Sequence, residues 1–170
     1  ILFKHDSRNI MEKKETKIID EFLTDSECDY LINFYKKNEN FAYSFRDVFP
    51  LNLNDFSEQN NSLKFLTDKL NNEAFKINNS KIDWFEIVKW PKGSYQPLHL
   101  DNASTETTLS SITYLNDNYE GGYTYYKNDL IIKPVKKRSL FFDGKYYEHG
   151  VKKVTKNTRF VVAAWYKINN

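Results

Sequence analysis

His99-Leu100-Asp101 places a histidine and an aspartate on either side of one leucine, near the middle of the chain. In an extended strand, successive side chains point to opposite faces, so the imidazole and the carboxylate project from the same face. Both groups are common metal ligands. The motif is short and also fits an ordinary polar strand, so its meaning depends on what the rest of the chain supplies.

The third ligand must come from elsewhere in the sequence. The chain has three histidines, and His5 lies in a polar N-terminal stretch with no apolar periodicity to hold it in place. This leaves His149 as the partner of His99. Two histidines and one carboxylate form the facial triad that holds non-haem Fe(II) and leaves coordination positions open. The residue inventory therefore predicts a metal site made of His99, Asp101 and His149.

Strand-like segments surround these ligands between Ile82 and Trp165. The Gly121-Gly122 pair among them predicts a tight connection with positive φ. No helical period appears in this half of the chain, and the spacing is typical of a β-sandwich or jelly roll. The aromatic and β-branched runs lie at residues 82–90, 107–115, 123–126, 130–132, 139–142, 149–154 and 159–165.

The N-terminal part is predicted to contain two helices. Residues 17–23 read as a short opening strand, and the capping box at residues 24–27 starts a helix that runs to about residue 38. A leucine stripe predicts a second helix from about Ser62 to Phe75. Residues 41–58 lack clean periodicity, and we expect a strand followed by a mobile loop. The two helices should brace one face of the major sheet.

Length and composition are consistent with one domain over residues 1–170. With 40% hydrophobic residues the chain can bury a core, which we place in a jelly roll over about residues 82–167. The expected class is α+β, mainly β. Residues 1–16 are expected to form a flexible arm. Residues 1–10 precede the only methionine, Met11, so an added segment and a trimmed native arm are both consistent with the sequence.

The charge balance and the cysteine content narrow the possible partners. A net charge of +2 gives no strong field that would attract nucleic acid or a membrane. No apolar run is long enough to span a bilayer. The single cysteine, Cys28, cannot form an internal disulfide and is interpreted as a small buried hydrophobic residue. We expect a soluble cytoplasmic protein without membrane or nucleic-acid partners.

Several motifs around the ligands together resemble a known family. The sequence resembles the 2-oxoglutarate and Fe(II)-dependent dioxygenases, and most closely their prolyl 4-hydroxylase-like branch, from about Ile18 to the C-terminus. This resemblance implies a double-stranded β-helix, or jelly roll. The stretches that carry it are Trp90-Pro91-Lys92-Gly93, the histidine-aspartate motif, Tyr114-Leu115-Asn116, residues 120–124, His149-Gly150-Val151 and residues 159–165.

The resemblance assigns roles to individual positions. It implies that His99, Asp101 and His149 bind iron and are the catalytic residues, and that Arg159 binds the far carboxylate of 2-oxoglutarate. A guanidinium can hold a carboxylate through two hydrogen bonds, and an arginine that enters an apolar strand needs an anionic partner. Tyr114 matches a family tyrosine that contacts the same carboxylate, although a plain core aromatic is an equally good interpretation.

Other cosubstrate candidates depart from the family pattern. Trp90 stands where the family usually has a tyrosine, so it could contact substrate or serve only in packing. Tyr95 lies four residues before His99 instead of three, which turns a strand side chain to the other face unless a bulge restores it. We also include Trp165 among the cofactor-binding candidates. It stands where the nucleic-acid demethylases of the superfamily carry a second arginine, which disfavours that activity here.

The resemblance implies a hydroxylase that uses Fe(II), 2-oxoglutarate and O2, with ascorbate as an optional reductant. The family suggests a prolyl residue of a polypeptide as substrate. A free amino acid or another small metabolite stays open, as does a non-catalytic jelly-roll binding module. Halogenases have a small residue in place of the iron carboxylate, and Asp101 argues against that chemistry.

Residues 41–58 are also a candidate for a mobile flap over the iron. The segment is rich in large rings, and a reactive metal centre must be kept from water and stray reductants until substrate is in place. Arg46 would then contribute to substrate binding. The alternative is a plain strand whose aromatic face packs in the core.

Overall fold

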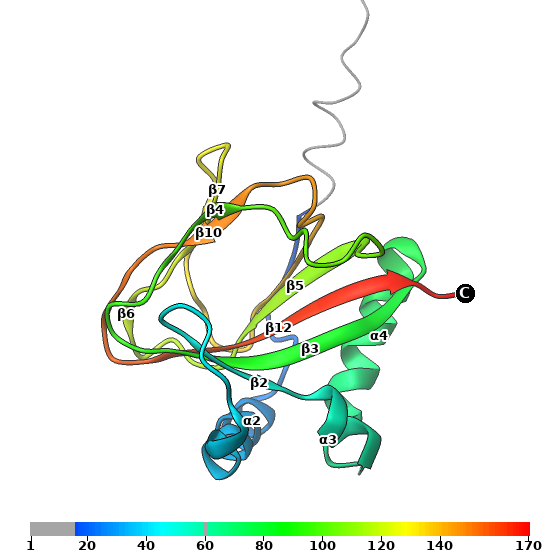
Figure 1. Ribbon diagram of the computed structural model, residues 1–170, viewed down its shortest axis with the longest axis horizontal. Helices are drawn as coiled ribbons and strands as arrows, with labels where there is room; N and C mark the ends of the chain where they lie inside the picture. The colour runs from blue at the N-terminus through cyan, green and yellow to red at the C-terminus, as the bar shows by residue number, and fades with distance from the viewer. Residues whose placement is uncertain (1–15, 60) are drawn as a thin grey trace, which may run out of the picture.

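The computed structural model describes residues 16–59 and 61–170 of the chain. Two antiparallel sheets lie opposite each other, as Figure 1 shows, and form the predicted jelly roll. The major sheet has the order β1 (Lys17–Ile19), β9 (Ser139–Phe142), β5 (Leu109–Tyr114), β12 (Arg159–Ile168), β3 (Ser80–Trp90) and β2 (Phe49–Asn52). The minor sheet has the order β4 (Gln96–His99), β10 (His149–Val151), β7 (Thr124–Tyr126) and β8 (Ile131–Ile132). A two-stranded ribbon joins β6 (Glu120–Gly121) to β11 (Val154–Lys156).

The helices lie on the side of the major sheet that faces away from the minor sheet (Figure 1). They are α2 (Asp25–Lys37), α3 (Asn54–Gln59) and α4 (Lys64–Asn78), with single 3-10 turns η1 (Glu39–Phe41) and η2 (Asn61–Leu63). Buried leucines of α2 and α4 pack against side chains of β3 and β12 in one apolar cluster. This confirms the prediction that two helices brace the major sheet. None of the helices in the described ranges is both long enough and apolar enough to cross a membrane.

The strands β3 and β12 separate this helix-packed core from the interior between the sheets. Alternate side chains of a strand point to opposite faces, and the odd residues Phe85 and Ile87 of β3 join the cluster beneath the helices. The antiparallel register sets the even residues of β3 beside the odd residues of β12, for example Trp90 beside Arg159 and Val88 beside Val161. The face toward the minor sheet is therefore lined by residues 84, 86, 88 and 90 of β3 and 159, 161, 163 and 165 of β12.

Both predicted helices form, and their ends follow the sequence signals. Thr24 caps α2: its side-chain oxygen accepts a hydrogen bond from the Glu27 amide, and the Glu27 carboxylate accepts one from the Thr24 amide. The second helix, α4, runs to Asn78, three residues beyond the expected Phe75, and its C-cap residue Asn79 adopts the left-handed conformation with φ 55°. Gly121 and Gly122 have the expected positive φ values. Cys28 is buried, and burial raises the pKa of its thiol to about 11.

Other boundaries differ from the predictions. The opening strand ends at Ile19 because Glu21, with φ 53°, turns the chain before the helix. Residues 149–154 divide into β10 and the start of β11. In residues 41–58 the expected order is wrong, since a loop comes first and is followed by β2 and α3. The expected flexible arm at residues 1–16 lies almost entirely outside the described residues.

Replacing Thr24 by Ala should lower the free energy of unfolding by about 1 kcal/mol, because the change removes the hydrogen-bond acceptor for the first turn of α2. Urea denaturation followed by circular dichroism measures this difference. The matched control is Thr105→Ala, at an exposed threonine outside the helices and strands. Equal stabilities of the two variants would show that the cap contributes nothing.

Candidate active site

The two histidines of the predicted metal site lie side by side on neighbouring strands. The register of β4 and β10 places His99 directly opposite His149, with their ring centroids 4.4 Å apart. Each Nδ1 lies within hydrogen-bond distance of a backbone carbonyl two residues earlier, 3.0 Å from Pro97 O and 2.8 Å from Tyr147 O. An Nδ1–H that donates to a carbonyl leaves Nε2 as the unprotonated ligand nitrogen. Both rings are therefore oriented for metal binding.

Asp101 completes the group from a position just beyond the end of β4. Its Oδ1 lies 3.5 Å from His99 Nε2 and 3.4 Å from His149 Nε2. The Asp101 amide donates to Gly144 O, and the Ser110 hydroxyl donates to Oδ2 at 2.6 Å. The expectation of one extended strand through Asp101 is wrong, because β4 ends at His99. The carboxylate is held by contacts with two other segments instead.

The electrostatics of this group suit a divalent metal. Ligand atoms of His99, Asp101 and His149 all lie within 4.8 Å of one another. Burial tends to raise the pKa of Asp101, but hydrogen bonds involving His149, His99 and Ser110 outweigh it and hold the pKa well below its usual range. The carboxylate is therefore ionised at neutral pH. Two imidazoles and one carboxylate on a single side of a cavity fit the facial geometry that leaves metal positions open.

Arg159 is fully buried at the start of β12. Its guanidinium carbon lies 4.8 Å from the ring centroid of Trp90 and 5.6 Å from that of Tyr114. None of its three guanidinium nitrogens has a hydrogen-bond partner among the described residues. No carboxylate pairs with this buried cation among the described residues, so it lacks the anionic partner that burial requires. A carboxylate that reaches into this end of the cavity would supply it.

Tyr114 and Trp90 support Arg159 in different ways. Tyr114 is buried, and its hydroxyl lies 2.5 Å from Thr124 Oγ1, which fixes the ring beneath the guanidinium. Trp90 packs its ring against the other side of Arg159, and its indole nitrogen has no partner among the described residues. Gly122 allows the strand connection to pass close by, since a Cβ there would lie 2.9 Å from Arg159 Cδ.

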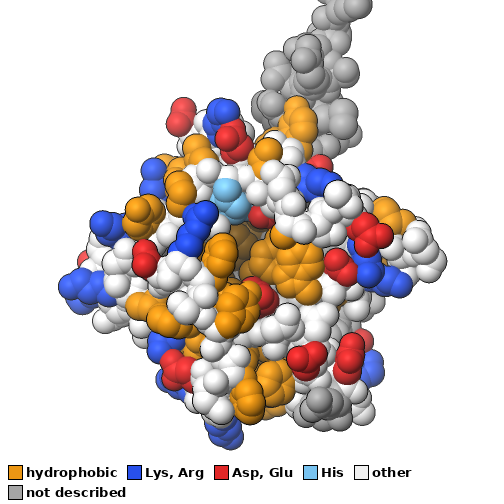
Figure 2. Space-filling view, viewed as in Figure 1, with side chains coloured by type: hydrophobic (Ala, Val, Ile, Leu, Met, Phe, Trp, Pro, Cys, Tyr) orange, Lys and Arg blue, Asp and Glu red, His pale blue; other side chains and the backbone are white. Residues whose placement is uncertain are grey.

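One cavity of about 320 Å³ connects the three metal-ligand candidates with Arg159. Its walls are mostly apolar and come from the inner faces of both sheets. Figure 2 shows the opening as a hollow near the centre of the face, bordered by hydrophobic side chains and with a histidine at its upper edge. The cavity can therefore hold a metal and a small dianion together, away from bulk water.

The remaining predicted site residues lie farther out. Tyr95 is half exposed in the turn before β4, with the ammonium of Lys153 5.7 Å from its ring centroid. Trp165 is six residues along β12 from Arg159, or roughly 20 Å at 3.3 Å per residue. It stacks against Trp84 with ring centroids 4.7 Å apart and lines the outer part of the cavity. A role for Tyr95 or Trp165 at the cosubstrate stays a prediction.

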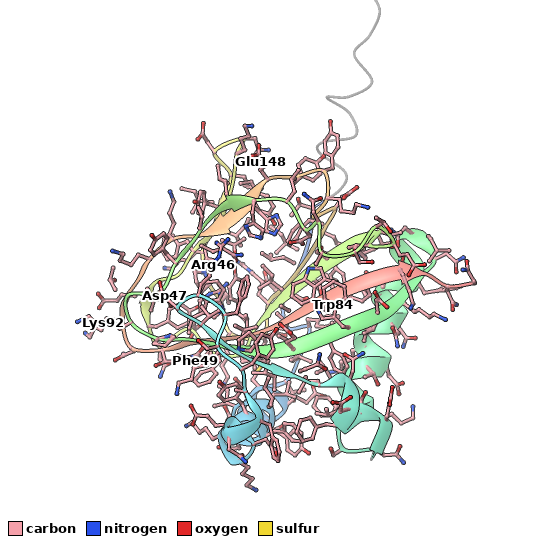
Figure 3. The ribbon with its side chains drawn as sticks, in the orientation of Figure 1. Arg46, Asp47, Phe49, Trp84, Lys92 and Glu148 are labelled. Atoms are coloured by element: carbon pink, nitrogen blue, oxygen red, sulfur yellow. The ribbon has the colours of Figure 1, made fainter. Side chains whose placement is uncertain are left out.

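The segment predicted as a flap has two parts. Residues 43, 45, 46 and 48 line the cavity, and Phe45 and Val48 form an isolated bridge that closes this loop. The second part is β2, paired to β3, followed by α3, and it buries Leu51 and Leu53 in the core. Arg46 extends from the loop toward the cavity, opposite Trp84 (Figure 3). The second part packs in the core through Leu51 and Leu53, whereas Phe49 is exposed, so the alternative of a strand with an aromatic core face is wrong. Mobility of the loop stays a prediction.

Three residues important to the geometry were missed in the sequence. Ser110 donates to Asp101, and Gly144 leaves room for it, since a Cβ at Gly144 would lie 2.2 Å from Asp101 Oδ2. Glu86 is a buried acid in the cavity wall. The alternation of β3 is a signal that could have identified Glu86, because it shares the face of Trp90. Nothing local indicates Ser110 or Gly144, which approach Asp101 only in the folded chain.

Comparison with known proteins found a matching family model and solved structures of similar fold. Residues 85–167 match the family model of the 2OG-Fe(II) oxygenase superfamily. A viral collagen prolyl hydroxylase from Paramecium Bursaria Chlorella virus-1, solved with 2OG, is 21% identical with a TM-score of 0.72, over 92% of this chain and 97% of that one. A prolyl hydroxylase from Trichoplax adhaerens was solved in complex with a peptide fragment of hypoxia inducible factor. It is 19% identical with a TM-score of 0.75, over 94% of this chain and 86% of that one.

A third solved structure, a Pseudomonas putida prolyl-4-hydroxylase, is 15% identical with a TM-score of 0.68, over 92% of this chain and 94% of that one. A search of curated proteins gave no match. The family match and the geometry agree on cofactors. Fe(II) is the metal of the histidine-aspartate-histidine site, and 2-oxoglutarate is the cosubstrate whose far carboxylate fits the unpartnered guanidinium of Arg159.

Replacing His149 by Ala should abolish Fe(II) binding and leave the fold largely intact. Removing a residue that only supports a metal ligand can lower metal affinity by roughly 100-fold, and removing the ligand itself should lower it further. Anaerobic Fe(II) titration measures the affinity, and circular dichroism measures the fold. Glu148→Gln is the control, because Glu148 pairs with Lys127 and points away from the cavity (Figure 3). Unchanged Fe(II) affinity in His149→Ala would contradict the assignment.

Replacing Arg159 by Leu should weaken 2-oxoglutarate binding by about 100-fold or more, since two charge-assisted hydrogen bonds are lost. Fe(II) affinity should stay nearly unchanged. Thermal stability should not fall, because a buried charge without a protein partner is replaced by an apolar side chain. Isothermal titration with 2-oxoglutarate under anaerobic conditions measures the effect. Arg138→Leu, at the surface arginine paired with Asp20, should bind the cosubstrate normally.

Proposed function

We propose that this chain, a member of the 2OG-Fe(II) oxygenase superfamily, is a hydroxylase that acts on a prolyl residue of a polypeptide. The observation that carries the proposal is that the facial triad and the buried, unpartnered Arg159 share one cavity. Solved structures with the same fold support the substrate class. They include a viral collagen prolyl hydroxylase and a prolyl hydroxylase in complex with a peptide fragment.

The chemistry depends on the cofactor and the cosubstrate. When bound, Fe(II) and 2-oxoglutarate supply the oxidation: O2 and 2-oxoglutarate give succinate and carbon dioxide, and one oxygen atom enters a C–H bond of the substrate. The protein contributes binding and orientation. His99, Asp101 and His149 would hold the metal from one side, which would leave its other positions open to cosubstrate and oxygen.

Arg159 determines where the cosubstrate lies. Its guanidinium is fixed between Trp90 and Tyr114, so a far carboxylate bound there points the keto-acid end back toward the metal ligands. The walls between the two sites are apolar, with Val88 and Val161 in the major sheet among the lining residues. Such walls exclude water and strengthen the electrostatic contacts at both ends of the cosubstrate.

The cavity mouth offers a surface on which a peptide could lie. Exposed aromatic rings of Tyr43, Phe45 and Tyr95 surround it, and the Trp84 and Trp165 rings continue it along the major sheet. Aromatic side chains are common in surfaces that bind polypeptides. The alternatives are a free amino acid or small metabolite as substrate, or a binding module without catalysis. A complete set of metal ligands together with Arg159 disfavours the second alternative.

Incubation of the Fe(II)-loaded protein with 2-oxoglutarate, O2 and a panel of proline-containing peptides tests this function. We expect succinate to form in proportion to a mass gain of one oxygen atom on a peptide, with the new hydroxyl on proline by tandem mass spectrometry. His149→Ala should give neither product, because the metal is lost. Ascorbate is included in half of the reactions to test its role as a reductant.

The same assay separates the alternatives. Oxidation of free proline or of another small amino acid, with no peptide modified, would replace the polypeptide substrate by a metabolite. Absence of succinate under all conditions, although Fe(II) and 2-oxoglutarate bind, would favour the binding module.

A further inference from the structure

Glu86 is a buried acid that the metal and cosubstrate sites do not use. It lies in the middle of β3, opposite Ala163 of β12, and is 6% exposed. The hydroxyl of Tyr43 donates to its Oε1 at 2.5 Å. Burial is the main cause that raises the pKa of this carboxyl. Within residues 16–59 and 61–170, no lysine or arginine pairs with Glu86, and its Oε2 accepts no hydrogen bond.

The two charges at the inner end of the cavity, Asp101 and Arg159, have a present or an expected partner, whereas the outer part holds Glu86 and Arg46, which form no ion pair with each other among the described residues. Asp101 faces two histidines and accepts a hydrogen bond from Ser110. Arg159 lies at the inner end, where the far carboxylate of the cosubstrate is expected. Fe(II) and Asp101 together with Arg159 and the dianion sum to zero charge. The metal and the cosubstrate therefore leave Glu86 without a counter-charge, and a cation bound beside it would favour its carboxylate form against the effect of burial.

Aromatic rings lie next to this anion. Trp84 and Trp165 occupy the next cross-strand pair outward on the same face, and their rings are nearly parallel at an interplanar angle of 17°. Figure 3 shows Trp84 on the opposite side of the cavity from Arg46. Arg46 places its guanidinium 5.5 Å from the ring centroid of Phe45. A desolvated carboxylate beside indole faces is an arrangement that attracts cations.

We propose that Glu86 determines substrate specificity by binding a cationic group of the substrate, an ammonium or a guanidinium, next to the Trp84–Trp165 pair. The proposal rests on the proposed function, since the cation must belong to the molecule that is hydroxylated. Glu86 is four residues from Trp90, or about 13 Å along the strand. A lysine or arginine side chain a few residues from the target, or the amino group of a small substrate, could supply the charge.

The test measures binding and turnover of matched peptides. Proline-containing peptides carry one lysine at successive distances from the proline, and each has a partner with norleucine or Nε-acetyl-lysine at that position. Binding is followed by fluorescence anisotropy under anaerobic conditions with Fe(II) and 2-oxoglutarate present. At the best position, we expect the lysine peptide to bind about 10- to 100-fold more tightly than the neutral peptides.

Variants of Glu86 separate charge recognition from a structural role. Glu86→Gln keeps the shape and an acceptor for Tyr43, and it should abolish the preference for lysine while binding the norleucine peptide as the wild type does. Asp83→Asn is the matched control: it also removes one carboxylate from β3, but Asp83 pairs with Lys167 and does not line the cavity. This variant should keep the preference.

The outcomes distinguish this proposal from the proposed function. Equal binding of charged and neutral peptides by the wild type, or an equal loss for both in Glu86→Gln, would overturn the role of Glu86 even if proline is hydroxylated. A preference for lysine that depends on Glu86, without oxidation of proline, would support the role of Glu86 in binding a cation and would reject proline as the hydroxylated residue. Free lysine and arginine, tested as competitors, identify a small-molecule source if they bind with the same dependence on Glu86.

Discussion

The pairing of β3 with β12 is the constraint on which both the core and the site depend. From Arg159 to Trp165, seven consecutive pairs keep the odd residues of β12 beside the even residues of β3, and the register shifts only after Trp165. One face packs against α2 and α4, and the other lines the cavity. A shift of one residue would turn Arg159 toward the helices and Phe160 into the cavity. The register therefore determines packing and chemistry together.

Desolvated charges organise the interior between the two sheets. Arg159, Asp101 and Glu86 are all largely buried in a wall that is otherwise mostly apolar. Each creates a requirement for an opposite charge, because an unpaired ion in such surroundings is costly. Asp101 meets part of this requirement with two histidines, and the far carboxylate of a cosubstrate would meet it for Arg159. Each buried charge without a partner in the protein therefore indicates the charge of the ligand group that would bind next to it.

Parts of the site could be predicted because they belong to short, regular segments. Arg159 begins a long apolar strand, and the inventory of three histidines left His149 as the partner of His99. The segment 41–58 could not be divided correctly. Some of its aromatic residues lie in a loop and line the cavity. The strand β2 joins the edge of the major sheet through hydrogen bonds to β3, and no local sequence pattern predicts such pairing.

The sequence by itself determined the strand-rich class, the capped helix α2 and the His99, Asp101 and His149 set, and it placed Arg159 at the start of an apolar strand. These follow from periodicity, capping and residue chemistry, which act over a few neighbouring positions. Only the tertiary structure decided how Asp101 is held, which residues share the wall with Glu86, and where Trp165 lies relative to Arg159. These depend on contacts between segments far apart in the chain, such as Gly144 against Asp101, whose geometry is set by sheet register and packing.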